Sequence, residues 1–278
     1  MISSKKYVDQ TLKKYNLEAN KALGQNFLIE EKIVDNIINN ADISKETYVI
    51  EIGPGLGALT EKLISVAKYV HAFEIDKNMC NILSETFSDS PNFSFTNIDF
   101  LKLDLDGLFN DLSNEKDIKI ISNLPYYITS QILNKILFGN YNVSALVVMM
   151  QKEVGIKLIK PTNKELSPLY SLLSYKYKTE VIQHVGKNSY LPRPDIDSIV
   201  LKISKIDPIY KVNNENIFYQ LLKDLYKNRR KTITNNLQHY FNTKEQVINF
   251  LKSISIDENK RIEQLTLKEI TDISNRLG

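Results

Sequence analysis

Short apolar runs alternate with helical patterns along the first two thirds of the chain. The segments between them, such as ALTEKLISVA (58–67), repeat their apolar residues at helical spacing. The apolar runs, which are rich in β-branched residues, are TYVIEI (47–52), YVHAFEID (69–76), NFSFTNID (92–99), DIKIIS (117–122) and ALVVMMQ (145–151). This alternation predicts an α/β fold with a doubly wound parallel sheet. EVIQHVGK (180–187) and DSIVLKIS (197–204) are expected to close the sheet as an antiparallel pair.

The pattern changes near Ile206. The segment DPIYKVNNEN (207–216) has the composition of a linker. Only helical patterns follow it: IFYQLLKDLYKN (217–228), RRKTITNNLQHYF (229–241), KEQVINFLKS (244–253) and LKEITDISNRL (267–277). We therefore predict two domains, residues 1–206 with the α/β sheet and residues 207–278 as a small all-helical C-terminal domain.

The amino-acid composition argues against several classes of protein but does not identify a function. The net charge of +3 is too small to identify a nucleic-acid-binding protein by itself. A single cysteine excludes an intramolecular disulfide and suits a reducing, cytoplasmic location. The three histidines have no metal-ligand spacing, so no metal is expected. No apolar run reaches the roughly 18 residues of a membrane span, and the N-terminal segment lacks the apolar stretch of a secretory signal.

A glycine-rich loop, EIGPGLGAL (51–59), follows the first predicted strand and opens a helix. Glycines at such a turn let the backbone approach a ligand that a Cβ atom would block. Gly53 and Gly55 with Ala58 match the dinucleotide-binding pattern, whereas Gly53 and Gly55 with Gly57 match the S-adenosylmethionine loop. The loop alone leaves both cofactors open.

Two carboxylates end the next two predicted strands. Glu74 lies 21 positions after Gly53, where a carboxylate can accept hydrogen bonds from both ribose hydroxyls of either cofactor. Asp99 ends the third strand and could accept a hydrogen bond from an adenine amino group. A simpler alternative for Asp99 is the N-cap of a helix.

The segment SNLPY (122–126) follows the fourth strand, at the sheet edge where such folds bind ligands. Its residues suit methyl transfer to an adenine N6, a poor nucleophile whose lone pair is delocalised into the ring. The Asn123 side-chain oxygen and a backbone carbonyl, that of Leu124, could accept its two N–H groups. Pro125 stiffens the turn, and Tyr126 offers a flat face on which the base can stack. No strong general base is needed, because the methylated nitrogen loses its proton readily.

Further motifs extend over nearly the whole chain: KALGQNFLIE (21–30), EIGPGLGALT (51–60), VVMMQKEVGIKL (147–158), SYLPRPDIDSIVLKI (189–203) and NRRKTITNNL (228–237). Together with NLPY they resemble the rRNA adenine N6-dimethyltransferases, and within them the KsgA group. The resemblance implies a class I, Rossmann-like methyltransferase fold with S-adenosylmethionine as cofactor. The cofactor contacts that it implies, with the loop glycines, are Asn26, Leu28, Gly53, Gly55, Glu74, Asp99 and Asn123.

The resemblance also implies how the substrate is held. Asn123, Leu124 and Tyr126 would hold the target adenine, and Tyr190 would cover its other face, where the family usually has Phe. The implied reaction is dimethylation of N6 on two adjacent adenosines in a hairpin loop near the 3′ end of 16S rRNA, during small-subunit ribosome biogenesis. The substrate would be rRNA in a pre-ribosomal particle, and the enzyme is expected to act as a monomer.

Basic residues mark the expected RNA-binding surface. Arg193 lies in the second base-contacting motif, and Arg229, Arg230 and Lys231 are expected to begin a helix of the C-terminal domain that also carries Asn235 and Asn236. Arginine suits phosphate binding because its guanidinium donates two parallel hydrogen bonds.

Three alternatives are open at this point. A resistance methyltransferase for large-subunit rRNA would have the same fold and chemistry, but the segments LGQNFL (23–28) and RRKT (229–232) favour the KsgA group. A non-catalytic assembly factor or transcription factor would be expected to have lost catalytic residues, whereas Glu74, Asp99 and Asn123 are present. A dinucleotide oxidoreductase would leave NLPY without a role.

Overall fold

The computed structural model describes residues 1–278, apart from the side chain of Lys21. The chain forms two compact units. The first consists of Met1–Ile156 and Thr179–Lys205, and the second of Lys157–Lys178 and Ile206–Gly278. Residues 157–178 thus group with the C-terminal helices, although they come before residue 206 in the chain. Whether 1–206 and 207–278 are independent domains stays a prediction.

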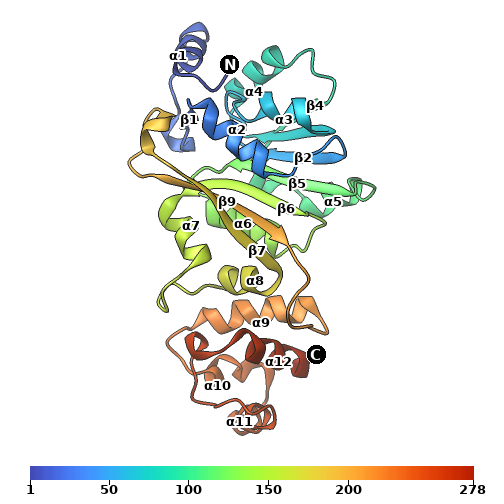
Figure 1. Cartoon of the computed structure of the whole chain (residues 1–278). Helices are drawn as coiled ribbons and strands as arrows, with labels where there is room; N and C mark the ends of the chain where they lie inside the picture. The colour runs from blue at the N-terminus through green and yellow to red at the C-terminus, as the bar shows by residue number, and fades with distance from the viewer. The chain divides into compact units, whose positions relative to one another are not determined.

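The first unit is built on a seven-stranded sheet with the order β4-β3-β2-β5-β6-β9-β7 (Figure 1). Neighbours among β2 to β6 are parallel, and β9 is antiparallel to β6. The predicted α/β fold is confirmed, and the two closing runs lie side by side as β9 and β7. The strands are β2 (Thr47–Ile52), β3 (Tyr69–Glu74), β4 (Phe93–Asn97), β5 (Asp117–Asn123), β6 (Ala145–Gln151), β7 (Tyr177–Val185) and β9 (Ser198–Lys205).

Helices connect the parallel strands, and a second, two-stranded antiparallel sheet joins two segments far apart in the sequence. That small sheet pairs β1 (Phe27–Leu28) with β8 (Tyr190–Leu191). The α-helices of this part of the chain are α1 (Lys5–Lys14), α2 (Glu31–Asn40), α3 (Thr60–Val66), α4 (Lys77–Thr86), α5 (Leu105–Asp111), α6 (Thr129–Leu137) and α7 (Lys152–Ile159). The short 3₁₀ helices are η1 (Lys21–Leu23), η2 (Phe100–Lys102) and η3 (Lys187–Ser189).

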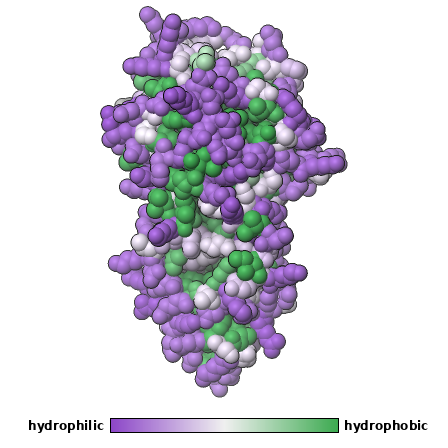
Figure 2. Space-filling model, viewed as in Figure 1, coloured by the Kyte–Doolittle hydropathy of each residue, from purple (hydrophilic) through white to green (hydrophobic). Residues whose placement is uncertain are grey.

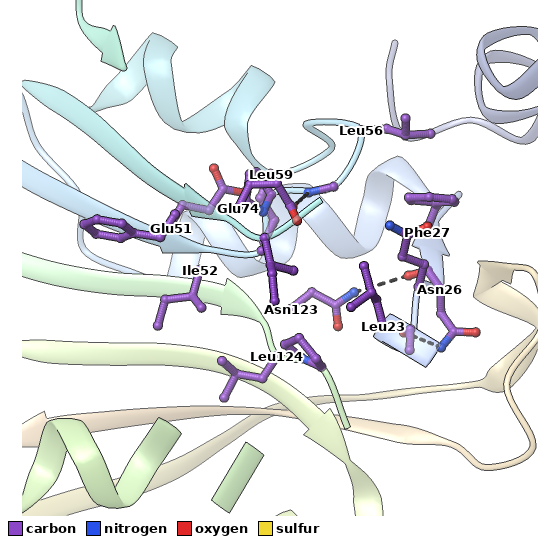
Figure 3. Close-up of a pocket in the computed structure, with 18 of the residues that line it drawn as sticks. Leu23, Asn26, Phe27, Glu51, Ile52, Leu56, Leu59, Glu74, Asn123 and Leu124 are labelled. Carbon is purple, nitrogen blue, oxygen red and sulfur yellow. Dashed lines mark hydrogen bonds between the residues drawn. The ribbon is translucent and has the colours of Figure 1, made fainter. Parts of the chain in front are cut away.

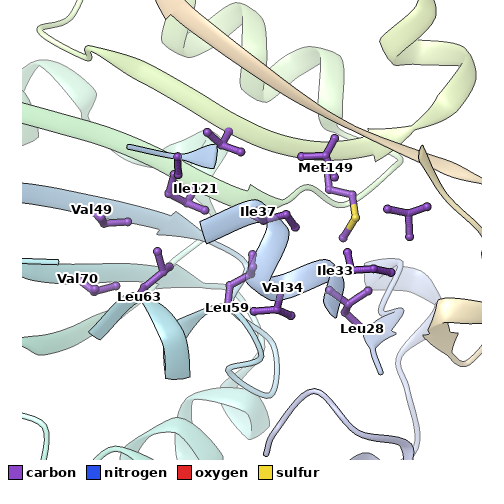
Figure 4. Close-up of a cluster of buried hydrophobic side chains, with 14 of the residues drawn as sticks. Leu28, Ile33, Val34, Ile37, Val49, Leu59, Leu63, Val70, Ile121 and Met149 are labelled. Carbon is purple, nitrogen blue, oxygen red and sulfur yellow. The ribbon is translucent and has the colours of Figure 1, made fainter. Parts of the chain in front are cut away.

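One hydrophobic cluster fixes α2 and α3 to the sheet (Figure 4). The helix residues Ile33, Val34 and Ile37 share one face of α2, and all three are buried. They pack with Val49, Val70, Ile121 and Met149 from four strands. Burying an aliphatic side chain of this size contributes roughly 1.5–3 kcal/mol. Packing in this cluster fixes α2 and α3 against the strands whose carboxyl ends form the site described below.

The helices of the second unit agree with the sequence pattern except in one place. They are α8 (Pro168–Lys176), α9 (Glu215–Lys227), α10 (Ile233–Asn236), α11 (Lys244–Ser253) and α12 (Leu267–Leu277), with η4 (Gln238–Tyr240) and η5 (Ile262–Gln264). The predicted helix over 229–241 is wrong at its start, because α9 ends at Lys227 and the chain turns over residues 228–231, whereas α10 and η4 lie within the predicted range. The Asn236 amide donates to the carbonyls of Leu225 and Asn228 at the end of α9, which holds this turn in place.

The surface is mostly hydrophilic on the face that Figure 2 shows, with hydrophobic residues in separate patches. The large hydrophobic side chains that are exposed among the described residues are Met1, Ile75, Tyr127, Ile156, Val181, Ile206 and Ile209. None of the helices, over the residues described, is long and apolar enough to cross a membrane. Ile75 and Tyr127 stand out because both line the pocket described next.

Candidate active site

A pocket lies at the carboxyl ends of β2, β3, β4 and β5 (Figure 3). It contains about 1100 Å³ of space not filled by atoms, including the part open to solvent. Strand β2 pairs with β3 on one side and with β5 on the other, so the strand order reverses here. Open α/β sheets bind ligands at such a reversal. Its lining includes the predicted residues Asn26, Leu28, Gly53, Gly55, Glu74, Asp99, Asn123, Leu124, Pro125 and Tyr126.

The glycine loop after β2 forms one wall of this pocket. Gly53, Gly55 and Gly57 all have positive φ, of 65°, 58° and 89°. Other residues rarely adopt this backbone conformation, so the turn requires glycine. A Cβ on Gly57 would also lie 2.6 Å from the Phe87 ring. The loop therefore brings its bare backbone to the pocket.

Two buried carboxylates lie beside this loop. Glu51, in β2, is 1% exposed and accepts a hydrogen bond from the Thr60 hydroxyl at 2.7 Å. Burial raises its pKa to about 8, and the nearby Glu74 contributes to the rise. Glu74 is 5% exposed, and burial raises its pKa as well. No Lys, Arg or His occurs among the described residues of the lining, so burial favours the protonated form of both groups, and a ligand with positive charge would instead favour the carboxylates.

Glu74 also braces the loop from the end of β3. One of its oxygens accepts from the Gly55 N–H at 3.1 Å and the other from the Asp76 N–H at 2.8 Å. Asp99 accepts from the Leu101 N–H at 2.9 Å as the N-cap of η2, which is the simpler role considered for it. Each oxygen can accept more than one hydrogen bond, so both carboxylates can still bind a ligand.

The N-terminal segment of residues 20–28, of which residues 23–28 line the pocket, is held by contacts to the start of α4, to β5 and to β8. The Gln25 side chain donates to Asp76 at 2.7 Å, and the Asn123 amide donates to the Asn26 carbonyl at 3.4 Å. At the far end, Leu28 is buried in β1 and pairs with Tyr190. We call residues 20–28 the strap.

Two adjacent residues at the end of β5 each have a hydrogen-bond acceptor without a partner among the described residues. The Asn123 Oδ1 atom is buried without a partner. Figure 3 shows the hydrogen bond from the Asn123 nitrogen to the Asn26 carbonyl. The Leu124 N–H donates to the Met149 carbonyl at 2.9 Å, and no donor among the described residues bonds the Leu124 carbonyl. A buried acceptor without a partner costs roughly 1–3 kcal/mol, so this pair indicates a place for an N–H donor.

Tyr126 lines the pocket, and its hydroxyl contacts a serine outside the lining. That hydroxyl lies 2.6 Å from the Ser198 Oγ atom, and Ser198, at the start of β9, is fully buried. This contact fixes the far end of the aromatic ring. The sequence reading missed Ser198 because it lies 72 positions away in the chain.

Tyr190 does not line the pocket, although a stacking role was predicted for it. It is 2% exposed and belongs to the hydrophobic cluster of Figure 4. Its hydroxyl lies 2.9 Å from the Met149 sulfur, and burial strongly raises its pKa. A phenylalanine has no hydroxyl and could not make this contact, so the contact favours a buried position for the Tyr190 side chain. A contact with the target adenine stays a prediction.

The predicted RNA-binding residues differ from one another in their surroundings. Arg193 is exposed in the segment between β8 and β9. Arg229, Arg230 and Lys231 lie in the turn between α9 and α10, not at a helix start as predicted. The Arg229 guanidinium donates to the carbonyls of Asn163 and Lys164, both at 2.7 Å, whereas Arg230 and Lys231 are exposed. We call residues 228–231 the basic turn.

Glu51 is the other residue that the sequence reading missed. Its position two residues before Gly53, at the end of a strand that is otherwise apolar, was an available signal. A charged residue at a position expected to be buried points to a functional environment. For metals, no group of three His, Cys, Asp or Glu side chains in the described part of the chain could hold an ion.

Comparison with known proteins agrees with this geometry. The family described as "Ribosomal RNA adenine dimethylase" matches residues 16–278. The curated "Ribosomal RNA small subunit methyltransferase A" of Clostridium botulinum (strain Kyoto / Type A2) is 38% identical over 269 residues, which is 96% of each chain. The protein of the same name from Bacillus cereus (strain B4264) is 39% identical over 273 residues, 96% of this chain and 94% of the relative.

Two solved structures share the fold. A dimethyladenosine transferase from Plasmodium falciparum has a TM-score of 0.71 at 22% identity, covering 88% of this chain and 95% of the other. The 23S rRNA methyltransferase ErmE has a TM-score of 0.65 at 21% identity, covering 91% and 99%. With the family match over nearly the whole sequence, the chain belongs to the ribosomal RNA adenine dimethylases, a family of S-adenosylmethionine-dependent methyltransferases.

Proposed function

We propose that the chain dimethylates N6 of two adjacent adenosines in a hairpin loop near the 3′ end of small-subunit rRNA. The observation that carries this proposal is the pair of acceptors at Asn123 and Leu124, at the edge of a pocket suited to a cationic cofactor. An adenine N6 has two N–H groups, and the site offers two acceptors for them. The names of the curated relatives support the small subunit as the target.

The cofactor site fits S-adenosylmethionine because a positively charged ligand would favour the ionised form of its two buried carboxyl groups. The cofactor carries a sulfonium and an ammonium group, and Glu51 and Glu74 are buried without a basic partner in the described lining. Glu74 and Asp99 would hold its nucleoside part, with Asn26, Leu28 and the backbone at Gly53 and Gly55 beside them. Once bound, the cofactor supplies an electrophilic methyl group.

Asn123 and Leu124 act on the nucleophile. When the Asn123 oxygen and the Leu124 carbonyl accept the two amino protons, the nitrogen is drawn out of the plane of the adenine and its lone pair becomes available. N6 would then accept the methyl group that the bound cofactor supplies, leaving the demethylated cofactor, and would release one proton to solvent. After the first transfer one N–H remains, so one acceptor suffices for the second. Pro125 keeps the turn in shape, and its carbonyl accepts from Thr129 at the start of α6.

Tyr126 positions the base. Its ring lines the pocket, and the Ser198 contact keeps the ring from rotating away. Stacking of a base on such a ring contributes on the order of 1–3 kcal/mol. A flipped adenine in a loop is also less costly to expose than a paired one. We propose that Arg193, Arg230 and Lys231 contact rRNA phosphates.

The proposal extends to the setting of the reaction. A precursor particle of the small subunit in the cytoplasm is the expected substrate, with the chain acting as a monomer during ribosome biogenesis.

Mass mapping of rRNA tests this function. The protein is incubated with cofactor and either unmethylated small-subunit particles or large-subunit rRNA, and methylated nucleosides are located by mass spectrometry. The expected product is N6,N6-dimethyladenosine at two neighbouring positions of the small-subunit rRNA. Modification of large-subunit rRNA alone would instead support a resistance methyltransferase.

A further inference from the structure

Tyr127 is an exposed aromatic residue at the mouth of the cofactor pocket. Its side chain is 53% exposed, whereas most large apolar side chains of the pocket lining are buried. The preceding Tyr126 has its hydroxyl bound by Ser198, so the two adjacent rings have different environments. None of the roles assigned above uses Tyr127.

The Tyr127 ring lies against the strap. A Cβ atom placed on Gly24 would be 3.4 Å from Cδ1 and 3.7 Å from Cε1 of the ring. Gly24 also has a φ of 65°, so a side chain there would be strained as well as crowded. Gln25, the next residue, is bound to Asp76. The ring thus abuts a segment that is anchored independently of it, and the two meet at the rim of the pocket.

The chemistry around Tyr127 points to the nucleoside part of the cofactor. Burial raises the pKa of the Tyr127 phenol, and the nearby Asp99 and Glu74 contribute to the rise. Ile75, 44% exposed, is a second apolar side chain of the lining. Carboxylates that can accept from an amino group and hydroxyls, together with an exposed ring and an aliphatic side chain, match a purine with its ribose. Exposed apolar surface at a pocket mouth gains stability when a ligand covers it.

We propose that Tyr127 is a clasp that packs against the nucleoside of bound S-adenosylmethionine and slows its release. The clasp rests on the proposed cofactor site and not on the identity of the rRNA. Because Tyr127 meets the strap at Gly24, its ring and the strap cover the bound nucleoside from one side. Loss of the ring removes contacts to the ligand without exposing the core, since Tyr127 is already half exposed.

Binding without RNA tests the clasp. S-adenosylhomocysteine serves as probe because it cannot transfer a methyl group. Its Kd and dissociation rate are measured by calorimetry and stopped flow for wild type, Tyr127→Ala, Tyr127→Phe and the control Ile209→Ala, an exposed apolar residue outside the pocket lining. We expect Tyr127→Ala to raise the Kd by about five- to thirty-fold, chiefly through faster dissociation, as stacking energies convert to affinity. Tyr127→Phe and Ile209→Ala should stay within twofold, at unchanged thermal midpoints.

A second variant gives an optical signal. The chain contains no tryptophan, so Tyr127→Trp introduces a single one. Its emission should change in a saturable way as S-adenosylhomocysteine is added. Unchanged emission, or a Tyr127→Ala Kd within twofold of wild type, would overturn the clasp. If Tyr127→Ala weakened only the binding of small-subunit particles, the ring would belong to the RNA surface. Absence of binding by the wild type would refute the cofactor site itself, a separate result.

Discussion

The pocket and the basic turn both contain residues that sequence patterns mark as functional, yet they differ in which polar groups remain available to a ligand. In the pocket, the Asn123 oxygen is buried and has no partner. In the basic turn, the two terminal nitrogens of Arg229 donate to backbone carbonyls while its Nε atom is buried without a partner, and Arg230 and Lys231 are exposed to solvent. An unsatisfied buried group costs free energy and calls for an explanation, which a ligand gives at a pocket. An exposed charged side chain is solvated and carries no such free-energy cost, so it is weaker evidence for a binding site.

The Asn123–Leu124 segment and the basic turn also differ in what determines their conformation. Asn123 and Leu124 lie at the end of a rigid strand, and their spacing is fixed by backbone geometry. The conformation of the basic turn depends on contacts with residues outside it, including the hydrogen bonds from the Asn236 side chain to the end of α9. The predictions below change one region at a time, in order of decreasing expected effect.

Removal of the Asn123 amide should have the largest effect. We expect Asn123→Ala to lower the single-turnover rate of methyl transfer by about 10²–10³, the usual loss for one electrostatic contact aimed at a transition state. Measurement at saturating cofactor separates this step from binding. Asn110→Ala, an exposed asparagine of α5, is the matched control. A rate for Asn123→Ala within threefold of wild type would remove this residue from the mechanism.

The buried Glu51 should make stability depend on pH. Its pKa is about 8 in the folded chain and 4.5 as the ordinary value. Between these values the folded state binds a proton that the unfolded state has released, so stability should fall as pH rises through this window and level off above pH 8. In Glu51→Gln this fall should be smaller by a few kcal/mol, because no carboxylate ionises.

Denaturant unfolding of both proteins at a series of pH values, without cofactor, measures the difference. Glu46→Gln, an exposed carboxylate before β2, should behave like the wild type. Parallel pH profiles for wild type and Glu51→Gln would show that Glu51 is ionised in the folded chain.

The contact between Tyr126 and Ser198 should have a moderate, coupled effect. Tyr126→Phe and Ser198→Ala each remove one hydrogen bond of about 1 kcal/mol, which corresponds to a roughly fivefold loss of rate. The double variant should lose no more than either single one, because both changes delete the same contact. Single-turnover rates of all four proteins complete this cycle. Losses that multiply would mean that Ser198 acts independently of Tyr126.

The basic turn should show the smallest effects. Arg229→Ala loses two bonds to backbone carbonyls, and we expect a destabilisation of about 1 kcal/mol, reduced by the partial exposure of the side chain. Arg230→Ala and Lys231→Ala should change stability by less than about 0.5 kcal/mol. If the latter two contact phosphates, each should flatten the salt dependence of particle binding by about 0.7–0.9. Equal stability losses for Arg229 and Arg230 would contradict the structural role of Arg229.

The parts of the fold that the sequence predicts depend on residue patterns within short segments. The run TYVIEI predicts a buried strand because its residues are apolar and β-branched, and the loop after it requires glycine because of positive φ. The glycine loop and the NLPY turn belong to one site because both follow strands of one parallel sheet. These relations need no knowledge of distant contacts.

Apart from Glu51, for which the sequence offered a signal, the missed features depend on tertiary contacts. Ser198 meets Tyr126 only because β9 lies beside β6 in the sheet. The predicted helix at Arg229 follows from helix-forming residues, but the bonds to Asn163 and Lys164 hold this arginine in a turn. Tyr190 matches a stacking position in the sequence, while its hydroxyl contacts the Met149 sulfur inside the core.

One paired measurement tests most directly whether the pocket carries the chemistry. The single-turnover rate at saturating particle and cofactor, and the affinity for the particle, are determined for Asn123→Ala and for the double variant Arg230→Ala, Lys231→Ala. The account predicts that Asn123→Ala loses at least 100-fold in rate with particle affinity within threefold of wild type. The basic-turn variant should keep its rate at saturation and lose only affinity. A basic-turn variant with the larger loss of rate, or an Asn123→Ala protein that transfers methyl groups at the wild-type rate, would contradict it.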